Sequence, residues 1–315
     1  MLSFRTRTEP EGWVGCAPQG ANCALALVQR AADGRPAVRW ALVLDWHQPA
    51  QALHRLRRSR SLQRHRRVAL LQRSQYQCIT MDAPADLRRD EWPDAVRWKL
   101  EEVVEFPVDS AAIDVLAVPE GTSYRAQPQL IAVAAPATEV QPLVDQAADA
   151  GVPWHAVDIA ETALRNLSVL VEPEGRSQAL LHCDADHATL VVTFAGELLS
   201  ARHFDCERAL LASDDQDTRQ RALDQLGLEL QRSLDGIERS YGQVSLARLL
   251  VTPMAGADAL CQHLKPLLYV PVEPLDLGQA LDLSQVPELA ADADALNRQV
   301  CAIGAALRPL GGEGG

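Results

Sequence analysis

The amino-acid sequence contains one short pattern twice, and this duplication constrains the fold more than any other feature. Each copy predicts three consecutive strands, because short apolar runs are separated by turn residues such as Asp33-Gly34 and Ala195-Gly196. The expected strands are Trp13 to Cys16, Asn22 to Gln29 and Val38 to Leu44 in the first copy, and Gln178 to Asp184, Ala188 to Phe194 and Glu197 to Phe204 in the second. A repeated three-strand unit predicts an α/β (α+β) fold with two similar halves.

A helix and a strand are predicted between the two copies, in the stretch from Trp92 to Pro119. The helix should run from Asp94 to Glu105, because Asp is a good N-terminal capping residue and Pro107 disfavours helical geometry just before it. Its apolar stripe consists of Val96, Leu100, Val103 and Val104. The strand Ile113 to Val118, with strands at Gln77 to Met81 and Gln129 to Ala135, predicts a small sheet covered by one or two helices.

The other elements complete two halves separated by the turn-rich segment Val171 to Gly175. We expect a first half at 1–170, with the small sheet inserted at about 77–136, and a second half at 176–315 whose last helix packs back on the first. The remaining helices are expected at Glu139 to Ala150, Glu161 to Val169, Thr218 to Tyr241 and Ala290 to Leu307, and the remaining strands at Val68 to Leu71, Trp154 to Ile159, Arg248 to Val251 and Tyr269 to Val272.

Composition excludes several classes of protein. With 315 residues and 47% hydrophobic content the chain can bury a substantial core, and a net charge of −12 argues against general nucleic-acid binding. The start of the chain, MLSFRTRTEPEG, lacks the apolar core of a secretion signal, and no apolar run is long enough to span a membrane. Seven scattered cysteines without a CxxC pair indicate reduced thiols, so we expect a cytoplasmic protein.

One segment departs from the acidic average. Ala50 to Ala69 contains seven arginines and no acid, namely Arg55, Arg57, Arg58, Arg60, Arg64, Arg66 and Arg67. Apolar residues at helical spacing predict a helix here. Its arginines either are solvated and cover neighbouring apolar surface with their stems, or form a docking patch for anionic lipid headgroups or an acidic partner.

The sequence shows no pattern for nucleophilic catalysis, because no nucleophile elbow or similar motif is present. A metal site is conceivable at His182, Asp184, Asp186 and His187, since imidazoles and carboxylates bind transition metals. Adjacent strand residues point to opposite faces, so His182 and His187 should not converge. We therefore expect neither a catalytic residue nor a metal.

Several strings resemble those of a known family, and they occur in the family's order. They are AVRWKLEEVVEFPVDSAAIDVLAVP, VDIAETALRNL, GELLSARHF, LELQRSLDGIERSYG and AIGAALR, which together extend from about Leu70 to Arg308. This set is similar to the MSHA biogenesis protein MshI and type IV pilus assembly protein PilM family. The resemblance implies an actin-like (ribonuclease H-like) duplicated fold with an inserted small subdomain of the FtsA and PilM type.

The resemblance also places a nucleotide pocket, and the sequence departs from it in three turns. The corresponding residues are Gly15, Gln19, Gly20, Asp184, Asp186 and Gly256. No Asp-x-Gly pattern occurs in either phosphate turn, a single glycine replaces a Gly-Gly pair in the adenosine turn, and Lys99 and Lys265 are the only lysines. We therefore expect a degenerate pocket with no cofactor. The alternative is a functional ATPase with Mg²⁺ near Asp184 or Asp186.

Proteins of this family hold the N-terminal cytoplasmic peptide of a single-pass inner-membrane partner, in a groove between the inserted subdomain and the main body. The resemblance points to Trp98, Lys99, Ile113 and Val115 as the corresponding region. The function it implies is a non-catalytic scaffold at the cytoplasmic face of the inner membrane, with a PilN-like partner. Membrane contact through Arg55 to Arg67 and homo-oligomerisation stay open.

Overall fold

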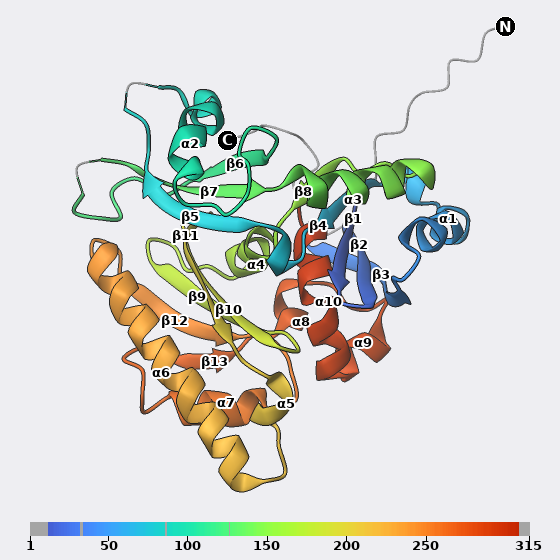
Figure 1. Cartoon of the computed structure of the whole chain (residues 1–315). Helices are drawn as coiled ribbons and strands as arrows, with labels where there is room; N and C mark the ends of the chain where they lie inside the picture. The colour runs from blue at the N-terminus through green and yellow to red at the C-terminus, as the bar shows by residue number, and fades with distance from the viewer. Residues whose placement is uncertain (1–11, 32–33, 86, 126, 309–315) are drawn as a thin grey trace, which may run out of the picture.

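Two five-stranded sheets with the same strand order form the body of the protein (Figure 1). The computed structural model describes residues 12–31, 34–85, 87–125 and 127–308. The first sheet is β3 (Pro36–Asp45), β2 (Asn22–Arg30), β1 (Trp13–Gln19), β4 (Arg66–Leu70) and β8 (Ala156–Asp158); the second is β11 (Glu197–Asp205), β10 (His187–Phe194), β9 (Ser177–Cys183), β12 (Leu246–Val251) and β13 (Val272–Pro274). In each sheet three antiparallel strands are followed by two parallel ones, so the predicted duplication is confirmed.

Tight turns and burial explain why these strands form where the sequence predicts them. Ala195 and Gly196 both have positive φ, of 53° and 83°, which is the backbone that a two-residue hairpin with the right-handed strand twist requires. Every residue of β9 is buried, so both faces of that strand are covered, and its polar side chains Gln178 and His182 make hydrogen bonds inside the protein.

Helices cover both faces of each five-stranded sheet (Figure 1). The helices α1 (Pro49–Ser59) and α3 (Ala137–Asp149) cover the outer face of the first sheet, and α6 (Gln216–Ser240) and α7 (Ala257–Leu264) cover that of the second. The helices α4 (Ala160–Val169) and α10 (Ala293–Ala306) lie between the sheets. The short helices are η1 (Leu62–Arg64), η2 (Arg73–Gln75), η3 (Arg89–Glu91), α5 (Arg208–Leu211), α8 (Leu277–Ala280) and α9 (Pro287–Ala291).

Two glycines allow α4, α10 and β1 to pack with their backbones in contact. A Cβ atom on Gly304 of α10 would lie 2.2 Å from the carbonyl oxygen of Ala163 in α4. A Cβ atom on Gly15 of β1 would lie 2.0 Å from the carbonyl oxygen of Ala302 in α10. Because the neighbour is backbone in both cases, it cannot move aside as a side chain would. The spacing of these three elements therefore depends on glycine.

The small sheet consists of β5 (Gln77–Asp82), β7 (Gln129–Ala135) and β6 (Ala112–Ala117), and α2 (Trp92–Glu101) packs on it. The prediction that this helix continues to Glu105 is wrong, and Val103 is 55% exposed instead of part of the buried stripe. Acidic side chains at a helix C-terminus oppose the helix dipole, and Glu101, Glu102 and Glu105 cluster there. This repulsion is a physical reason for the early end.

Three other predicted boundaries are wrong. The helix expected over Ala50 to Ala69 ends at Ser59, because Ser61 has a left-handed φ of 51° and Arg66 already pairs with β1. The helix expected over Ala290 to Leu307 is divided into α9 and α10 at Asp292. The Asp292 side chain accepts hydrogen bonds from two backbone N–H groups and so caps the start of α10. The last strand begins at Val272 rather than Tyr269, where pairing with β12 starts.

No helix of the described ranges has both the length and the apolar character needed to cross a bilayer. The segment MLSFRTRTEPEG at the start of the sequence lies outside the described residues, apart from Gly12.

The glycine contact predicts that Gly→Ala changes the free energy of unfolding in opposite directions in α10 and α6. Gly304→Ala should lower the free energy of unfolding by about 1–3 kcal/mol, because the added methyl group overlaps backbone. Gly236→Ala in α6 is the matched control: a Cβ there meets nothing within 4 Å, so the change should raise stability by about 0.5–1 kcal/mol. Urea denaturation measures both, and equal effects would contradict the packing described.

Candidate functional site

The first of the three turns singled out in the sequence joins β1 and β2. Gly20 has a φ of +59° and points into open space, while the Gln19 side-chain Nε2 donates a hydrogen bond of 2.9 Å to the Arg298 carbonyl in α10. Gly15 does not belong to this turn. It lies in the middle of β1 opposite Ala26, so its lack of a side chain serves helix packing and its assignment to a phosphate turn is wrong.

The second turn, Asp184 to Asp186, joins β9 and β10 and uses its polar groups internally. The Asp184 N–H donates to the His187 carbonyl at 2.8 Å, and the Ala185 N–H donates to the Asp184 carboxylate at 2.8 Å. The Ala185 and Asp186 carbonyls accept hydrogen bonds from the N–H groups of Arg208 and Cys206. The segment that follows β11 therefore lies against this turn.

The third turn precedes α7 and lies beside the end of α5. Gly256 has a φ of +79°, and a Cβ atom there would lie 3.7 Å from the Leu211 carbonyl oxygen. Sequence reasoning associated Gly256 with adenosine binding, and the structure places the end of α5 beside it.

Arg208 links the second and third turns to α10. Its guanidinium Nη1 donates to Asp294 Oδ1 at 3.0 Å and to Asn297 Oδ1 at 2.8 Å. The Asn297 side chain donates in turn to the Pro253 carbonyl, and the Ala255 N–H donates to Asp294. Asp294 and Asn297 both belong to α10, so these hydrogen bonds connect the second turn, the third turn and α10. Sequence reasoning missed this network, because its members are distant in the chain.

His182 lies buried directly before the second turn. Its Nδ1 is 3.0 Å from Thr252 Oγ1, and burial lowers the pKa of His182 to about 4, against a weaker opposing effect of Asp184. His187 is exposed, 3.7 Å from Asp205. Among the residues that the structure describes, no group of three His, Cys, Asp or Glu side chains is placed to hold a metal ion.

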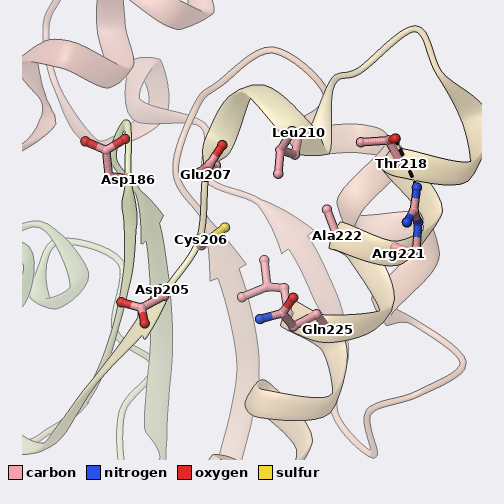
Figure 2. Close-up of a pocket in the computed structure, with 10 residues that line it drawn as sticks. Asp186, Asp205, Cys206, Glu207, Leu210, Thr218, Arg221, Ala222 and Gln225 are labelled. Carbon is pink, nitrogen blue, oxygen red and sulfur yellow. Dashed lines mark hydrogen bonds between the residues drawn. The ribbon is translucent and has the colours of Figure 1, made fainter.

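A cavity of about 580 Å³ lies beside the second turn, between the end of β11 and α6 (Figure 2). Asp186, Asp205 and Glu207 line one side. Thr218 and Arg221 of α6 line the other, joined by a hydrogen bond of 3.3 Å. Of its lining residues only Asp186 had been singled out from the sequence. The cavity is lined by three segments that are separate in the sequence, so no local sequence pattern predicts it.

A second polar cluster surrounds Glu161 in the first turn of α4. This side chain is fully buried and accepts hydrogen bonds from Tyr76 Oη at 2.5 Å, His203 Nε2 at 2.9 Å and Cys78 Sγ at 3.4 Å. Burial alone would raise the pKa of Glu161, but the hydrogen bond and charge of His203 hold it below its ordinary value. Burial and the Glu161 charge raise the pKa of Tyr76. The cluster joins the small sheet, α4 and β11.

The four residues proposed for partner binding do not all face the same way. Trp98 is 62% exposed on α2, with Lys99 Nζ 5.7 Å from its ring. Ile113 and Val115 are half-buried and pack against the core beneath α2. Of the four, only Trp98 is therefore exposed; Lys99 is half-buried and its Nζ lies 3.4 Å from the Asp82 carbonyl oxygen. Within the described residues β6 pairs only with β7, so its outer edge is free, and β6 lies beside the edge strand β11.

Comparison with solved structures decides the fold. The chain superposes on a chain of a "PilM-PilN type IV pilus biogenesis complex" with a TM-score of 0.72 and 20% sequence identity, over 96% of this chain and 100% of that one. It also resembles a Bacteroides thetaiotaomicron protein described as having an actin-like ATPase fold and unknown function, with a TM-score of 0.52, 11% identity, and 92% and 99% of the two chains covered.

The chain has the actin-like ATPase fold. The expected likeness to PilM is confirmed at the level of the fold, and the likeness to MshI stays a prediction. The sequence matches no protein-family model and no curated protein. Hydrogen bonds connect the three turns described above to α10, directly or through Arg208.

The low pKa of His182 predicts a specific pH dependence of stability. Below pH 6.5 the unfolded chain binds a proton at this residue that the folded chain does not, so the free energy of unfolding should fall between pH 6.5 and about 4. A shift of this size corresponds to about 3 kcal/mol over the whole range. His182→Asn should make the decline between pH 6.5 and 5 shallower, measured by urea denaturation at each pH.

His187→Asn is the matched control, because His187 is exposed on the same hairpin. It should leave the decline as in the unaltered protein. If His182→Asn and His187→Asn give the same slope of unfolding free energy against pH, burial of His182 does not cause the decline in stability.

Proposed function

We propose that this protein is a non-catalytic cytoplasmic scaffold of a type IV or MSHA-like pilus assembly machine. It binds the N-terminal cytoplasmic peptide of a PilN-like inner-membrane assembly protein. The observation that carries the proposal is the superposition over nearly the whole chain on a protein solved in a PilM-PilN complex. A partner anchored in the inner membrane would hold the scaffold at its cytoplasmic face.

The free edge of β6 supports a peptide site at the border of the small sheet. An extended peptide can add a strand to an open sheet edge through main-chain hydrogen bonds and needs no catalytic residue. Next to this border lies a cavity of about 200 Å³, lined by Val118, Thr122 and Gln129 among others. The β6–β7 loop is fixed to the end of α6 through the hydrogen bond from the Gln243 N–H to the Thr122 carbonyl. The border of the small sheet is therefore held in place by contacts with the second half of the chain.

Side chains near this border indicate which peptide fits. Trp98 supplies an exposed aromatic ring of the kind that often dominates binding energy. Glu101, Glu102, Glu105 and Asp109 are exposed where α2 ends. A peptide with an apolar anchor and basic residues would complement both features.

The polar groups of the three turns support a scaffold that works without a nucleotide. A triphosphate site needs free backbone N–H groups and positive charge. In the second turn the N–H groups of Asp184 and Ala185 already have acceptors, and the Arg208 guanidinium is taken by α10. The residues present therefore do not fit a triphosphate. ATP binding with Mg²⁺ remains the alternative function, with Asp184 or Asp186 near the metal.

Peptide binding tests the proposal. A fluorescent peptide with the N-terminal cytoplasmic residues of the adjacent PilN-like protein should bind the unaltered chain in an anisotropy titration. Trp98→Ala should weaken binding by a factor of about 10 or more, the usual effect of removing an anchor residue. Tyr269→Ala is the matched control, because Tyr269 is 53% exposed but belongs to the second half of the chain.

The control should bind as the unaltered protein does. Absence of binding by the unaltered protein would remove the mechanism of the proposed scaffold. Equal loss in both variants would show that the peptide does not use the α2 surface.

A further inference from the structure

The segment 46–81 differs in charge from the rest of the chain. It contains eight arginines and no Asp, Glu or Lys. Since the whole chain has a net charge of −12, the other residues together carry −20. The positive charge of such a segment is either hydrated and screened by solvent ions, paired with carboxylates of the chain, or available to an anionic partner.

The structure assigns some of these arginines to the fold. Arg67 is buried and donates hydrogen bonds to the carbonyls of Leu62, His65 and Pro153. Arg66 and Arg73 lie over the rings of Trp13 and Tyr76. These three side chains stabilise β4 and its surroundings. The sequence interpretation that treated Arg55 to Arg67 as one helical patch is therefore wrong at its C-terminal end.

The other five arginines form an exposed surface, which we call the arginine face. It consists of Arg55, Arg57, Arg58, Arg60 and Arg64, all of which are exposed. The helix α1 buries Ala52, Leu53 and Leu56 against the first sheet, so Arg55 and Arg58 point away from the core. Neutral partners are present, since Arg57 donates to Gln63 and Arg60 lies over Trp40.

Neighbouring carboxylates offset only part of this positive charge: hydrogen bonds with His47 and, to a smaller extent, the charge of Arg55 lower the pKa of Asp45. None of the five arginines forms an ion pair with a carboxylate of the described residues. Asp45 precedes α1 and contacts His47 at 2.7 Å. Asp145 and Asp149 are exposed on α3, which packs beside α1. The arginine face thus keeps an excess of positive charge.

The shape and chemistry of this surface favour an extended anionic plane over other partners. Three cavities of the described residues lie at the second turn, near Arg35 and at the β6–β7 loop, and no residue of α1 lines any of them. Bases of a nucleic acid need exposed aromatic rings for stacking, and Arg60 covers the ring of Trp40. Phospholipid headgroups need only cationic side chains that reach a common plane.

We propose that the arginine face binds the surface of a bilayer containing anionic phospholipids. The contact is electrostatic, because the apolar side of α1 is committed to the core. It does not depend on the proposed pilus function. Figure 1 shows α1 and α2 on different parts of the molecule, so lipid and peptide binding can be measured separately.

Vesicle sedimentation tests this proposal with lipid alone. Vesicles of about one third phosphatidylglycerol and two thirds phosphatidylcholine should bind the unaltered protein, and pure phosphatidylcholine vesicles should not. Raising the salt concentration from about 0.05 M to about 0.5 M should release the protein, because it screens exposed charges. Arg55→Gln/Arg58→Gln should lower the partition coefficient about 25-fold, or about fivefold for each arginine.

Arg232→Gln/Arg239→Gln on α6 is the matched control, because it changes the net charge equally at exposed helical positions. It should bind vesicles as the unaltered protein does. The Arg55→Gln/Arg58→Gln variant should keep the melting temperature and bind the PilN-like peptide normally, which separates this proposal from the proposed function.

Four outcomes would overturn the proposal. The unaltered protein could bind both kinds of vesicle equally, or not at all. The two double variants could lose binding equally, which would indicate net charge rather than the arginine face. Duplex DNA at the same phosphate concentration could remove the protein from vesicles completely, which would make the surface a nucleic-acid site.

Discussion

Backbone contact between α4, α10 and β1 is the constraint on which the rest of this structure depends. Gly304 meets Ala163, and Gly15 meets Ala302, at distances that leave no room for a methyl group. The Asn166 side chain adds a hydrogen bond of 2.9 Å to the Gly304 carbonyl. Because α10 is held so closely, its first turns lie within reach of the three turns at the ends of the sheets. The hydrogen bonds of Gln19 and Arg208 to α10 follow from this placement.

The small sheet is attached by a different interaction. Glu161 is a fully buried carboxylate, and burying a charge is costly unless donors surround it. Tyr76 and Cys78 supply donors from the small sheet side, and His203 supplies one from β11. The charge therefore joins three parts of the molecule. A rigid attachment of this kind suits a protein that presents the border of its small sheet to a partner.

Much of the fold could be predicted from the sequence, because local signals agree with tertiary structure there. The hairpin strands were predicted from apolar runs and turn residues such as Ala195 and Gly196, and the small sheet from the elements around Pro107. The errors have physical causes. Acidic residues end α2 at Glu101, and pairing of β4 with β1 overrides helical periodicity at Arg66. The resemblance to PilM then supplied what periodicity cannot, namely the arrangement of the halves.

Less of the candidate site could be predicted. Gln19, Gly20, Asp184, Asp186 and Gly256 do lie in turns, but Gly15 serves packing and Ile113 and Val115 face the core. The residues that organise the site, Arg208 and Glu161, carry no local signature. Each is recognised only by partners far away in the chain. Sequence patterns therefore identify turns, whereas the hydrogen bonds that fill them require the folded structure.

Isothermal titration calorimetry with Mg-ATP tests most directly whether the protein functions without a nucleotide at its three turns. Peptide binding in the same preparation shows that the unaltered protein is folded. It should release no binding heat with Mg-ATP, because polar groups at the turns are already hydrogen-bonded within the protein, through Gln19 and Arg208 to α10. Micromolar binding of Mg-ATP would contradict the account and favour a functional ATPase.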